Sequence, residues 1–380
     1  MNREALIVGA GTTPYTRRPS PEVTTTRLLA QAAREALESA GLEPRDVDGL
    51  GVASFSLAPD RAIDLAVRLG LRPRWLMDGT TGGAAALDML QHARRAVEAG
   101  DARAILLVAG DRLDASDFRE LVDNFNVATR DHLAPIPTGG PNALFALLTR
   151  RHMEAKGLDR SVYGAVVVAQ RAWASGNPNA AYRDPLTLAD YLDAPVVADP
   201  LTIYDCVPVV AGADAIVVAG EKGADVQPVR IRAVAACHNV DNQDGDGLQT
   251  GLRGLADQLW ADASAEPNDM DVVSIYDDYS AMILVQLEDL GFAPDGDVGR
   301  LVAERIGRRS LPVNTSGGQL SAGQAGAAGG MHGLVEVVTQ LRDEGGKRQV
   351  PGARLGLVSG YGMVAYRYGA CANVGVLERV

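Results

Sequence analysis

One pattern occurs twice along the chain and restricts the fold more than any other feature. In each half, a helix that starts with very small residues precedes a strand: residues 81–100 precede the apolar strand 104–110, and residues 326–342 precede the strand 355–359. Continuous apolar strands are typical of a parallel sheet covered on both faces, and small residues at a helix start allow close packing of backbone or ligand. A duplicated βαβαβ unit with buried central helices predicts an α/β fold with five layers, αβαβα.

The other strand and helix patterns in the sequence complete two such halves. Strand patterns occur at residues 5–11, 214–219, 229–235 and 271–275, and helical patterns at 24–40 and 251–261. Between residues 111 and 200 the pattern weakens, because prolines and glycines interrupt shorter helical stretches; this predicts an inserted loop subdomain. We predict an N-terminal half at residues 1–225, with the loop subdomain at about 111–200, and a C-terminal half at residues 226–380.

Composition and charge exclude several classes of function. An apolar content of 47% with 22% charged residues indicates a globular chain, and a net charge of −12 with scattered basic residues argues against nucleic acid as a partner. There is no apolar run of about 20 residues and no signal-peptide pattern, so we expect a cytoplasmic protein that does not bind a membrane. Cys206, Cys237 and Cys371 lack the spacing of a disulfide framework or a zinc site, so no metal is expected.

Several ordered segments then resemble the thiolase superfamily over nearly the whole chain. The segment 8–14 resembles the first strand and turn of that family, and the segment 100–110 resembles the passage after its nucleophile helix. Asn314-Thr315-Ser316-Gly317-Gly318 is similar to the family's Asn-x-x-Gly-Gly segment, and residues 323–330 stand in place of its Gly-His-Pro loop. The resemblance implies the thiolase fold.

The catalytic residues of a thiolase are replaced here. By the resemblance, the nucleophilic cysteine falls at Gly83, its activating histidine at Gln324, and the second cysteine near residues 359–362. A glycine cannot form an acyl-enzyme, and an amide cannot act as a general base near neutral pH. The resemblance therefore implies chemistry without a covalent intermediate.

The segment Tyr276-Asp277-Asp278-Tyr279-Ser280 resembles the thiolase-like aldolases of steroid side-chain degradation, which carry a tyrosine-aspartate pair at this point. The agreement is incomplete, because those aldolases have a further tyrosine and a histidine in the loop that is residues 321–329 here. The candidate catalytic residues are Tyr276, Tyr361, Asp277, Asp278 and His332. The candidate substrate-binding residues are Gly83, Asn314, Gly317, Gly318 and Gln324.

Each candidate also has a structural interpretation that the sequence leaves open. Tyr276 and Tyr361 could be packed aromatic residues, and His332 could be a packed histidine of the second small-residue helix. Asp277 and Asp278 could be the N-cap and first-turn carboxylate of a helix that begins near Ser280. An unperturbed tyrosine pKa near ~10 is too high for a base at pH 7, so Tyr276 would need a lowered pKa or a hydrogen-bonded relay.

The resemblance implies retro-aldol cleavage of a branched 3-hydroxyacyl-CoA, with acyl-CoA as substrate and no cofactor. It also implies a homodimer formed through the strand after the first buried helix, and a small OB-fold, zinc-ribbon partner protein in a heterotetramer. Two alternatives remain: an acetyl-CoA acetyltransferase with atypical catalytic residues, and a non-catalytic thiolase-like subunit of a complex.

Overall fold

The computed structural model describes residues 3–124, 127, 129–133, 135–136, 140–221, 226–239, 247–365 and 368–380. Within these residues, nine strands form one sheet in the order β3-β2-β4-β7-β1-β8-β11-β10-β9. The strands are β1 (Leu6–Thr12), β2 (Gly49–Ala53), β3 (Trp75–Asp78), β4 (Ala104–Asp111), β7 (Gly212–Ala219), β8 (Val229–His238), β9 (Val272–Ser274), β10 (Leu355–Ala365) and β11 (Tyr368–Arg379).

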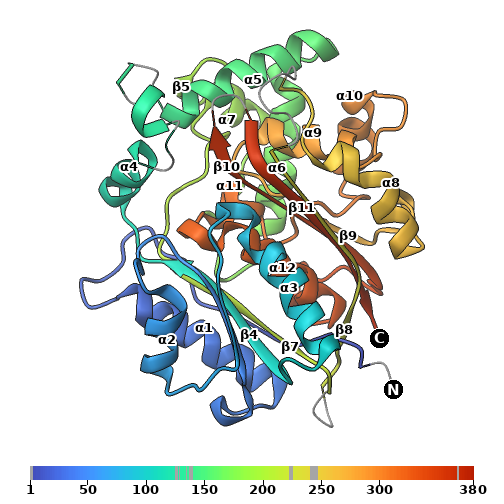
Figure 1. The fold of residues 1–380 in the computed structure, drawn as a ribbon. Helices are drawn as coiled ribbons and strands as arrows, with labels where there is room; N and C mark the ends of the chain where they lie inside the picture. The colour runs from blue at the N-terminus through green and yellow to red at the C-terminus, as the bar shows by residue number, and fades with distance from the viewer. Residues whose placement is uncertain are drawn as a thin grey trace.

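The sheet has two arms that meet where β1 pairs with β8. The pairing at this joint is short, and its register places Leu6 opposite Arg230 and Ile7 opposite Val229. Helices α3 (Ala85–Ala99) and α12 (Gly329–Leu341) contact each other and lie between the arms (Figure 1). Both helices are therefore buried in the centre, as the small residues at their starts predict.

Further helices cover the outer faces of the two arms. Helices α1 (Thr25–Ala40) and α2 (Arg61–Leu69) pack on the N-terminal arm, and α8 (Leu252–Ala263) and α9 (Ser280–Asp289) pack on the C-terminal arm. The order helix, sheet, helix, sheet, helix confirms the predicted five-layer architecture. Helix α1 also begins and ends as predicted, because Thr24 accepts a hydrogen bond from the Arg27 N–H and Gly41 closes the helix in the left-handed conformation.

The two central helices begin at the same point of the molecule. Each follows a short 3-10 turn of small residues, Gly82–Ala84 before α3 and Gly326–Ala328 before α12. A Cβ atom at Gly330 would lie 2.0 Å from the carbonyl oxygen of Gly83, so these two backbones touch. The duplicated pattern thus brings two helix N-termini together, and the candidate site forms around them.

The segment between β4 and β7 is more regular than the sequence predicts. It contains α4 (Ala115–Asp123), α5 (Gly140–Lys156), α6 (Arg160–Ala174), α7 (Leu188–Leu192), and the strands β5 (Val196–Ala198) and β6 (Leu201–Thr202). Helices α5 and α6 have 17 and 15 residues, so the prediction of only shorter helical stretches is wrong. Pro141 looks like a helix breaker, but it lies in the first turn of α5, where a missing N–H costs nothing. Two short helices, α10 (Val298–Leu301) and α11 (Gly318–Ala322), complete the described C-terminal half.

The position of β4 corrects the predicted dimer contact. We expected dimerisation through the strand after the first buried helix, which is β4. That strand pairs with β2 on one side and β7 on the other, and all its residues are buried, so it offers no edge to a second chain. Among the described strands, β3 is the edge strand of this arm.

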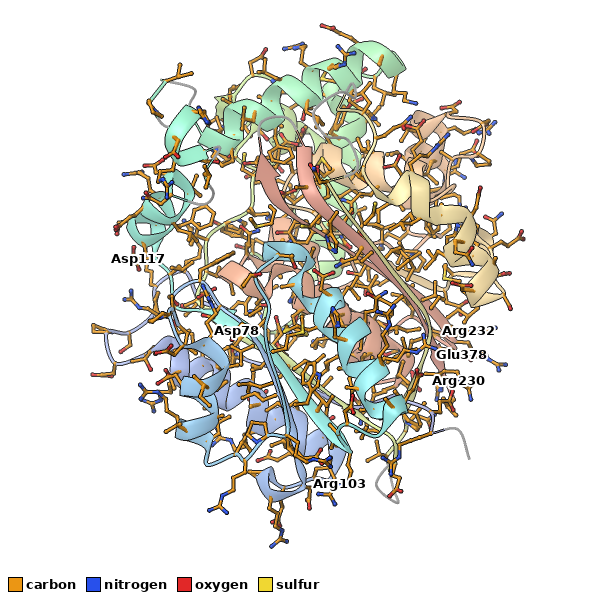
Figure 2. All side chains as sticks on the ribbon, in the orientation of Figure 1. Asp78, Arg103, Asp117, Arg230, Arg232 and Glu378 are labelled. Carbon is orange, nitrogen blue, oxygen red and sulfur yellow. The ribbon has the colours of Figure 1, made fainter. Side chains whose placement is uncertain are left out.

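Charged side chains reinforce the joint between the arms. The Arg230 guanidinium lies 2.6 Å from Glu4 and 2.9 Å from Glu378, and Arg232 lies 3.3 Å from Glu378. Figure 2 shows Arg230, Arg232 and Glu378 together at the ends of β8 and β11. Partly exposed pairs of this kind contribute up to about 1 kcal/mol each. None of the described helices has the length and apolar character needed to cross a membrane.

Candidate functional site

The ring of Tyr276 fills the space in which a side chain at residue 83 would lie. A Cβ atom at Gly83 would be 2.2 Å from Cε2 of Tyr276 and 2.3 Å from the carbonyl oxygen of Tyr361. Real Cβ atoms do not approach other heavy atoms so closely, so this helix start tolerates only glycine while Tyr276 keeps its place. The phenol therefore stands where a nucleophilic side chain would project.

Buried polar groups fix the backbone that carries Tyr276. Its N–H donates to Ser359 Oγ at 3.0 Å, and its carbonyl accepts from Gln286 Nε2 at 2.7 Å. Ser359 in turn donates to Gln286 Oε1 at 2.8 Å. The Asn314 amide pairs with both backbone groups of Ile275, at 2.8 and 3.0 Å. Asn314, predicted to bind substrate, is thus placed as a support for the residue next to Tyr276.

The Tyr276 hydroxyl group is a neutral hydrogen-bonding group. Gln324 Nε2 donates to it at 3.0 Å, and Gln324 is only half-buried, so this side chain links the phenol to the surface. Burial raises the pKa of Tyr276 well above its usual value, and the nearby Asp278 charge raises it further. No lowered pKa supports a free phenolate, so the hydroxyl group can donate a hydrogen bond or a proton but is a poor base at pH 7.

Asp277 caps a helix, but not the one we predicted. Its carboxylate accepts from the Gln319 N–H at 2.9 Å, the Leu320 N–H at 3.3 Å and Gln170 Nε2 at 2.9 Å, so it holds the start of α11. Helix α9 has Tyr279 as its N-cap residue and no side-chain cap, which corrects the predicted capping role of the two aspartates. Burial raises the pKa of Asp277 to about 7, although the backbone N–H donors act against this.

The glycine pair Gly317-Gly318 makes room for this arrangement. A Cβ at Gly318 would lie 2.1 Å from Asp277 Oδ2, and a Cβ at Gly317 would lie 2.5 Å from Cβ of Ala174. Both glycines have positive φ values, 98° and 59°. The structure therefore places them beneath Asp277 and against α6; their predicted contact with substrate stays a prediction.

Asp278 has a different environment from Asp277. It is 8% exposed, and within the described residues its Oδ1 has no hydrogen-bond partner. Burial raises its pKa to about 8, and the charge of Asp277 adds to this rise. A carboxyl group that titrates near neutral pH next to a neutral phenol is the arrangement that acid/base chemistry requires.

The other two candidate catalytic residues, Tyr361 and His332, have hydrogen-bond partners away from the Tyr276 hydroxyl group. The Tyr361 hydroxyl accepts from the Gly369 N–H within the β10–β11 hairpin, and the backbone carbonyl of Tyr361 faces Gly83. His332 Nε2 lies 2.8 Å from Ser316 Oγ, and Nδ1 lies 3.8 Å from Asp214. His332 does line a cavity of about 10 Å³ that Tyr276 and Asp277 also line, which is space for about one water molecule.

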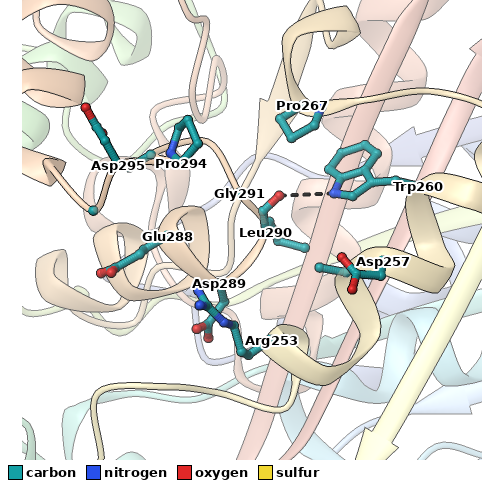
Figure 3. Close-up of a pocket in the computed structure, with 13 residues that line it drawn as sticks. Arg253, Asp257, Trp260, Pro267, Glu288, Asp289, Leu290, Gly291, Pro294 and Asp295 are labelled. Carbon is teal, nitrogen blue, oxygen red and sulfur yellow. Dashed lines mark hydrogen bonds between the residues drawn. The ribbon is translucent and has the colours of Figure 1, made fainter.

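A larger hollow lies elsewhere in the C-terminal half. Its volume is about 690 Å³, and it lies between one side of α8 and the end of α9 with the loop that follows (Figure 3). Trp260 and Arg253 line it together with acidic side chains of Asp257, Glu288 and Asp295. It shares no residue with the cavity beside Tyr276, and its residues do not supply the acid/base pair found there.

Cys206 and Cys371 supply no alternative nucleophile at neutral pH. Burial raises the pKa of Cys206 to about 12 and that of Cys371 to about 11, as their apolar surroundings in the sequence predicted. A thiol becomes a nucleophile only as the thiolate. These two side chains therefore do not replace the cysteine that is missing at Gly83.

Sequence reasoning missed the residues that support the site. Gln170 on α6, Gln286 on α9 and Ser359 on β10 come from three distant segments, and each bonds to Tyr276, to Asp277 or to another of these supports. Gln286 lies in the apolar helix α9, and a buried amide side chain requires a hydrogen-bond partner. This polar residue in an apolar helix is the feature of the sequence that indicates a supporting role.

Comparisons with known proteins agree with this geometry. Residues 233–371 match the family described as Thiolase C-terminal domain-like. The chain is 34% identical to the 17-hydroxy-3-oxo-4-pregnene-20-carboxyl-CoA lyase of Mycobacterium tuberculosis, over 90% of this chain and 92% of that protein. It is 30% identical to the steroid side-chain-cleaving aldolase of Thermomonospora curvata, over 89% of this chain and 90% of that protein.

The solved structure of the Ltp2-ChsH2(DUF35) aldolase has the same fold. It superimposes with a TM-score of 0.83 and 26% identity, and the match covers 99% of this chain and 98% of the other. The relatives are similar along nearly their whole length, and the site lacks a thiolase nucleophile. The chain therefore belongs to the thiolase superfamily, in the branch of the thiolase-like lyases and aldolases.

Proposed function

We propose that this protein is an acyl-CoA carbon–carbon lyase that cleaves a branched 3-hydroxyacyl-CoA by a retro-aldol reaction, without a covalent acyl-enzyme. The observation that carries the proposal is the position of the Tyr276 ring in the space next to Gly83. The same space cannot hold both a nucleophilic side chain and this phenol. A proton donor has taken the place of a nucleophile.

The reaction has three steps, which together conserve all atoms and electrons. A base removes the proton of the 3-hydroxyl group, the bond between carbons 2 and 3 breaks to give a ketone, and the electron pair forms the enolate of the shortened acyl-CoA. A proton then returns to carbon 2. No oxidant, reductant or second substrate is consumed, so the proposal includes no cofactor.

Tyr276 supplies the acid of this scheme. Its neutral hydroxyl group donates to the thioester oxygen as negative charge develops there, and it can deliver a proton to carbon 2 of the enolate. Gln324 holds the hydroxyl at 3.0 Å and orients it. Fixed donors aimed at a developing oxyanion lower the barrier because they need no rearrangement during the reaction.

The steroid side-chain type of substrate is proposed on the names of two relatives. One is a lyase of 17-hydroxy-3-oxo-4-pregnene-20-carboxyl-CoA, and the other is a steroid side-chain-cleaving aldolase. The hydroxyl of the first compound is placed as in a 3-hydroxyacyl-CoA, so the chemistry fits the site. We propose this compound as the first substrate to test.

The first prediction is that no acyl-enzyme forms when the protein meets acetyl-CoA or acetoacetyl-CoA. Residue 83 is glycine, and burial holds Cys206 and Cys371 as thiols. Intact-mass spectrometry after incubation should show the unmodified chain. An added acetyl group mapped to any of the three cysteines would instead support the alternative of an acetyltransferase with atypical residues.

The second prediction concerns the partner. We propose that the protein works with a small OB-fold, zinc-ribbon protein in a heterotetramer built on a homodimer, with β3 as the free edge for the dimer contact. The support is the likeness to an aldolase whose name includes a second, DUF35 component. Co-expression with a DUF35 protein encoded next to this one should give a stable complex with higher turnover. Cleavage at the full rate by the isolated chain would contradict the proposed need for a partner.

A non-catalytic role is the second candidate, and one observation favours it. The cavity beside Tyr276 is only about 10 Å³, so an acyl chain cannot reach the phenol until neighbouring side chains move. A subunit that only supports an active partner would show no loss of complex activity when Tyr276 is changed. The substitution described in the Discussion therefore separates the two candidates.

A further inference from the structure

Asp278 is a buried carboxyl group that leaves part of its hydrogen-bonding capacity unused. It lies in the turn between β9 and α9, with 8% exposure, and within the described residues Oδ1 accepts no hydrogen bond. The adjacent Asp277 accepts three. Leaving a buried carboxylate oxygen unpaired costs stability, so such a group is expected where function requires it.

One short segment connects Asp278 with the Tyr276 hydroxyl. Cys206 forms a bridge with Tyr279, next to Asp278, and Val209 forms a bridge with Gln324, whose amide holds the phenol. The Gln324 N–H also donates to the Pro208 carbonyl at 2.9 Å. Residues 206–209 are only partly buried, so this segment reaches the surface next to the residues that flank both groups.

The groups that face Asp278 do not neutralise it. They are Asp277 and the neutral side chains of Tyr276, Tyr279 and Cys206, whose pKa values the charge of Asp278 raises. The backbone N–H groups of Asp278 and Tyr279 also act on the carboxyl group and lower its pKa. The next acid, Asp205, is already bonded to Tyr191, Thr202 and Ser280. Among the described residues, no cation acts on the carboxyl group, and burial and the charge of Asp277 outweigh the two N–H donors, so its pKa is raised.

We infer that Asp278 is the base of the site, and that its unpaired Oδ1 removes the proton from the 3-hydroxyl group of the substrate. This inference rests on the proposed retro-aldol function. The O–H bond of the substrate breaks and a carboxylic acid forms at Asp278, while carbons 2 and 3 separate. Tyr276 gives its proton to carbon 2, and the proton held by Asp278 then restores the phenol.

Asp277 and Tyr276 are less suited than Asp278 to act as the base. Asp277 has both oxygens occupied by donors from α6 and α11. The phenol of Tyr276 has a raised pKa, so it is already protonated near pH 7 and cannot take up a further proton. A general base works best when its pKa lies near the working pH, and burial brings the pKa of Asp278 to about 8. Because Asp277 and Asp278 interact, the pair is expected to titrate as a unit.

The third prediction tests this base with Asp278→Asn in the complex with its partner, on 17-hydroxy-3-oxo-4-pregnene-20-carboxyl-CoA. The amide keeps the size of the side chain but cannot accept the proton, so kcat/KM should fall about 10²- to 10⁴-fold. Substrate binding, measured separately, should be retained. The rise of the wild-type kcat/KM between about pH 6 and 9, which reports the base losing its proton, should disappear in the variant.

Asp289→Asn is the matched control, because Asp289 is buried at the far end of α9 and its pKa is raised to about 7, but it bonds to Thr250 away from the site. That variant should keep the wild-type pH profile. If the wild type cleaves the substrate and Asp278→Asn does so at a near-normal rate, Asp278 is not the base, although the proposed function still holds. A wild-type complex that does not cleave the substrate would overturn the proposed function as well. If the Asn variant does not fold, a wild-type kcat/KM that is flat from pH 6 to 9 is the contradicting result.

Discussion

Replacing Tyr276 by phenylalanine is expected to lower kcat by about 10²- to 10⁴-fold, which corresponds to a barrier higher by about 3–5 kcal/mol. The substitution removes one oxygen atom and leaves the ring that packs against Gly83. It takes away the proton donor for the enolate and leaves the Gln324 amide without its acceptor. Turnover of a 3-hydroxyacyl-CoA by the complex, with binding measured separately, gives the result.

Tyr163→Phe is the matched control for this experiment. Tyr163 is also buried, at 1% exposure, and also makes one side-chain hydrogen bond, to His152 at 2.7 Å. Losing that bond should cost roughly 1 kcal/mol of stability and leave kcat unchanged. If Tyr276→Phe behaves in the same way, the chemistry lies elsewhere, and Tyr361 and His332 are the next residues to change.

Restoring a cysteine at residue 83 is expected to damage the site rather than to create a thiolase. The new Cβ would lie 2.2 Å from the Tyr276 ring and 2.3 Å from the Tyr361 carbonyl, and only the ring can move away. Overpacking of this kind costs about 1–3 kcal/mol or more. Because the phenol loses its position, we expect Gly83→Cys to lose about as much turnover as Tyr276→Phe. Thermal unfolding and turnover measure the two effects.

Gly254→Ala shows whether the loss at residue 83 is specific. Gly254 lies inside α8, and a Cβ there meets no atom within 4 Å. Alanine in a helix interior is expected to stabilise the chain by up to about 1 kcal/mol, with unchanged turnover. A stable Gly83→Cys protein that keeps full lyase activity would show that the ring and the side chain can share this space, against our account.

The architecture could be predicted because it depends on local patterns that repeat. Small residues at 82–86 and 326–330 mark two helices that must pack closely, and apolar strands beside them mark a covered sheet. The division into residues 1–225 and 226–380 remains a prediction. The position of β4 could not be predicted, because sheet order depends on pairings between distant segments.

The candidate site could be predicted only in part, because it depends on contacts between segments that are far apart in the sequence. Gly83, Gln324, Tyr276 and the two aspartates come from separate segments, and the structure brings them together. Which aspartate caps a helix is not a local property: Asp277 binds the start of α11, 42 residues away, although α9 begins only three residues after it. The difference in donors between Asp277 and Asp278, on which the chemistry depends, follows from the same long-range packing.

The most direct test of the account is product analysis without free CoA. The complex is incubated with 17-hydroxy-3-oxo-4-pregnene-20-carboxyl-CoA, and ketone and acyl-CoA are measured together by mass spectrometry. Retro-aldol cleavage needs no added thiol, so we predict ketone and shortened acyl-CoA in equal amounts, no mass added to the protein, and loss of both products in Tyr276→Phe. No cleavage of this substrate, together with CoA-dependent cleavage of a 3-oxoacyl-CoA through an acylated cysteine, would contradict the account.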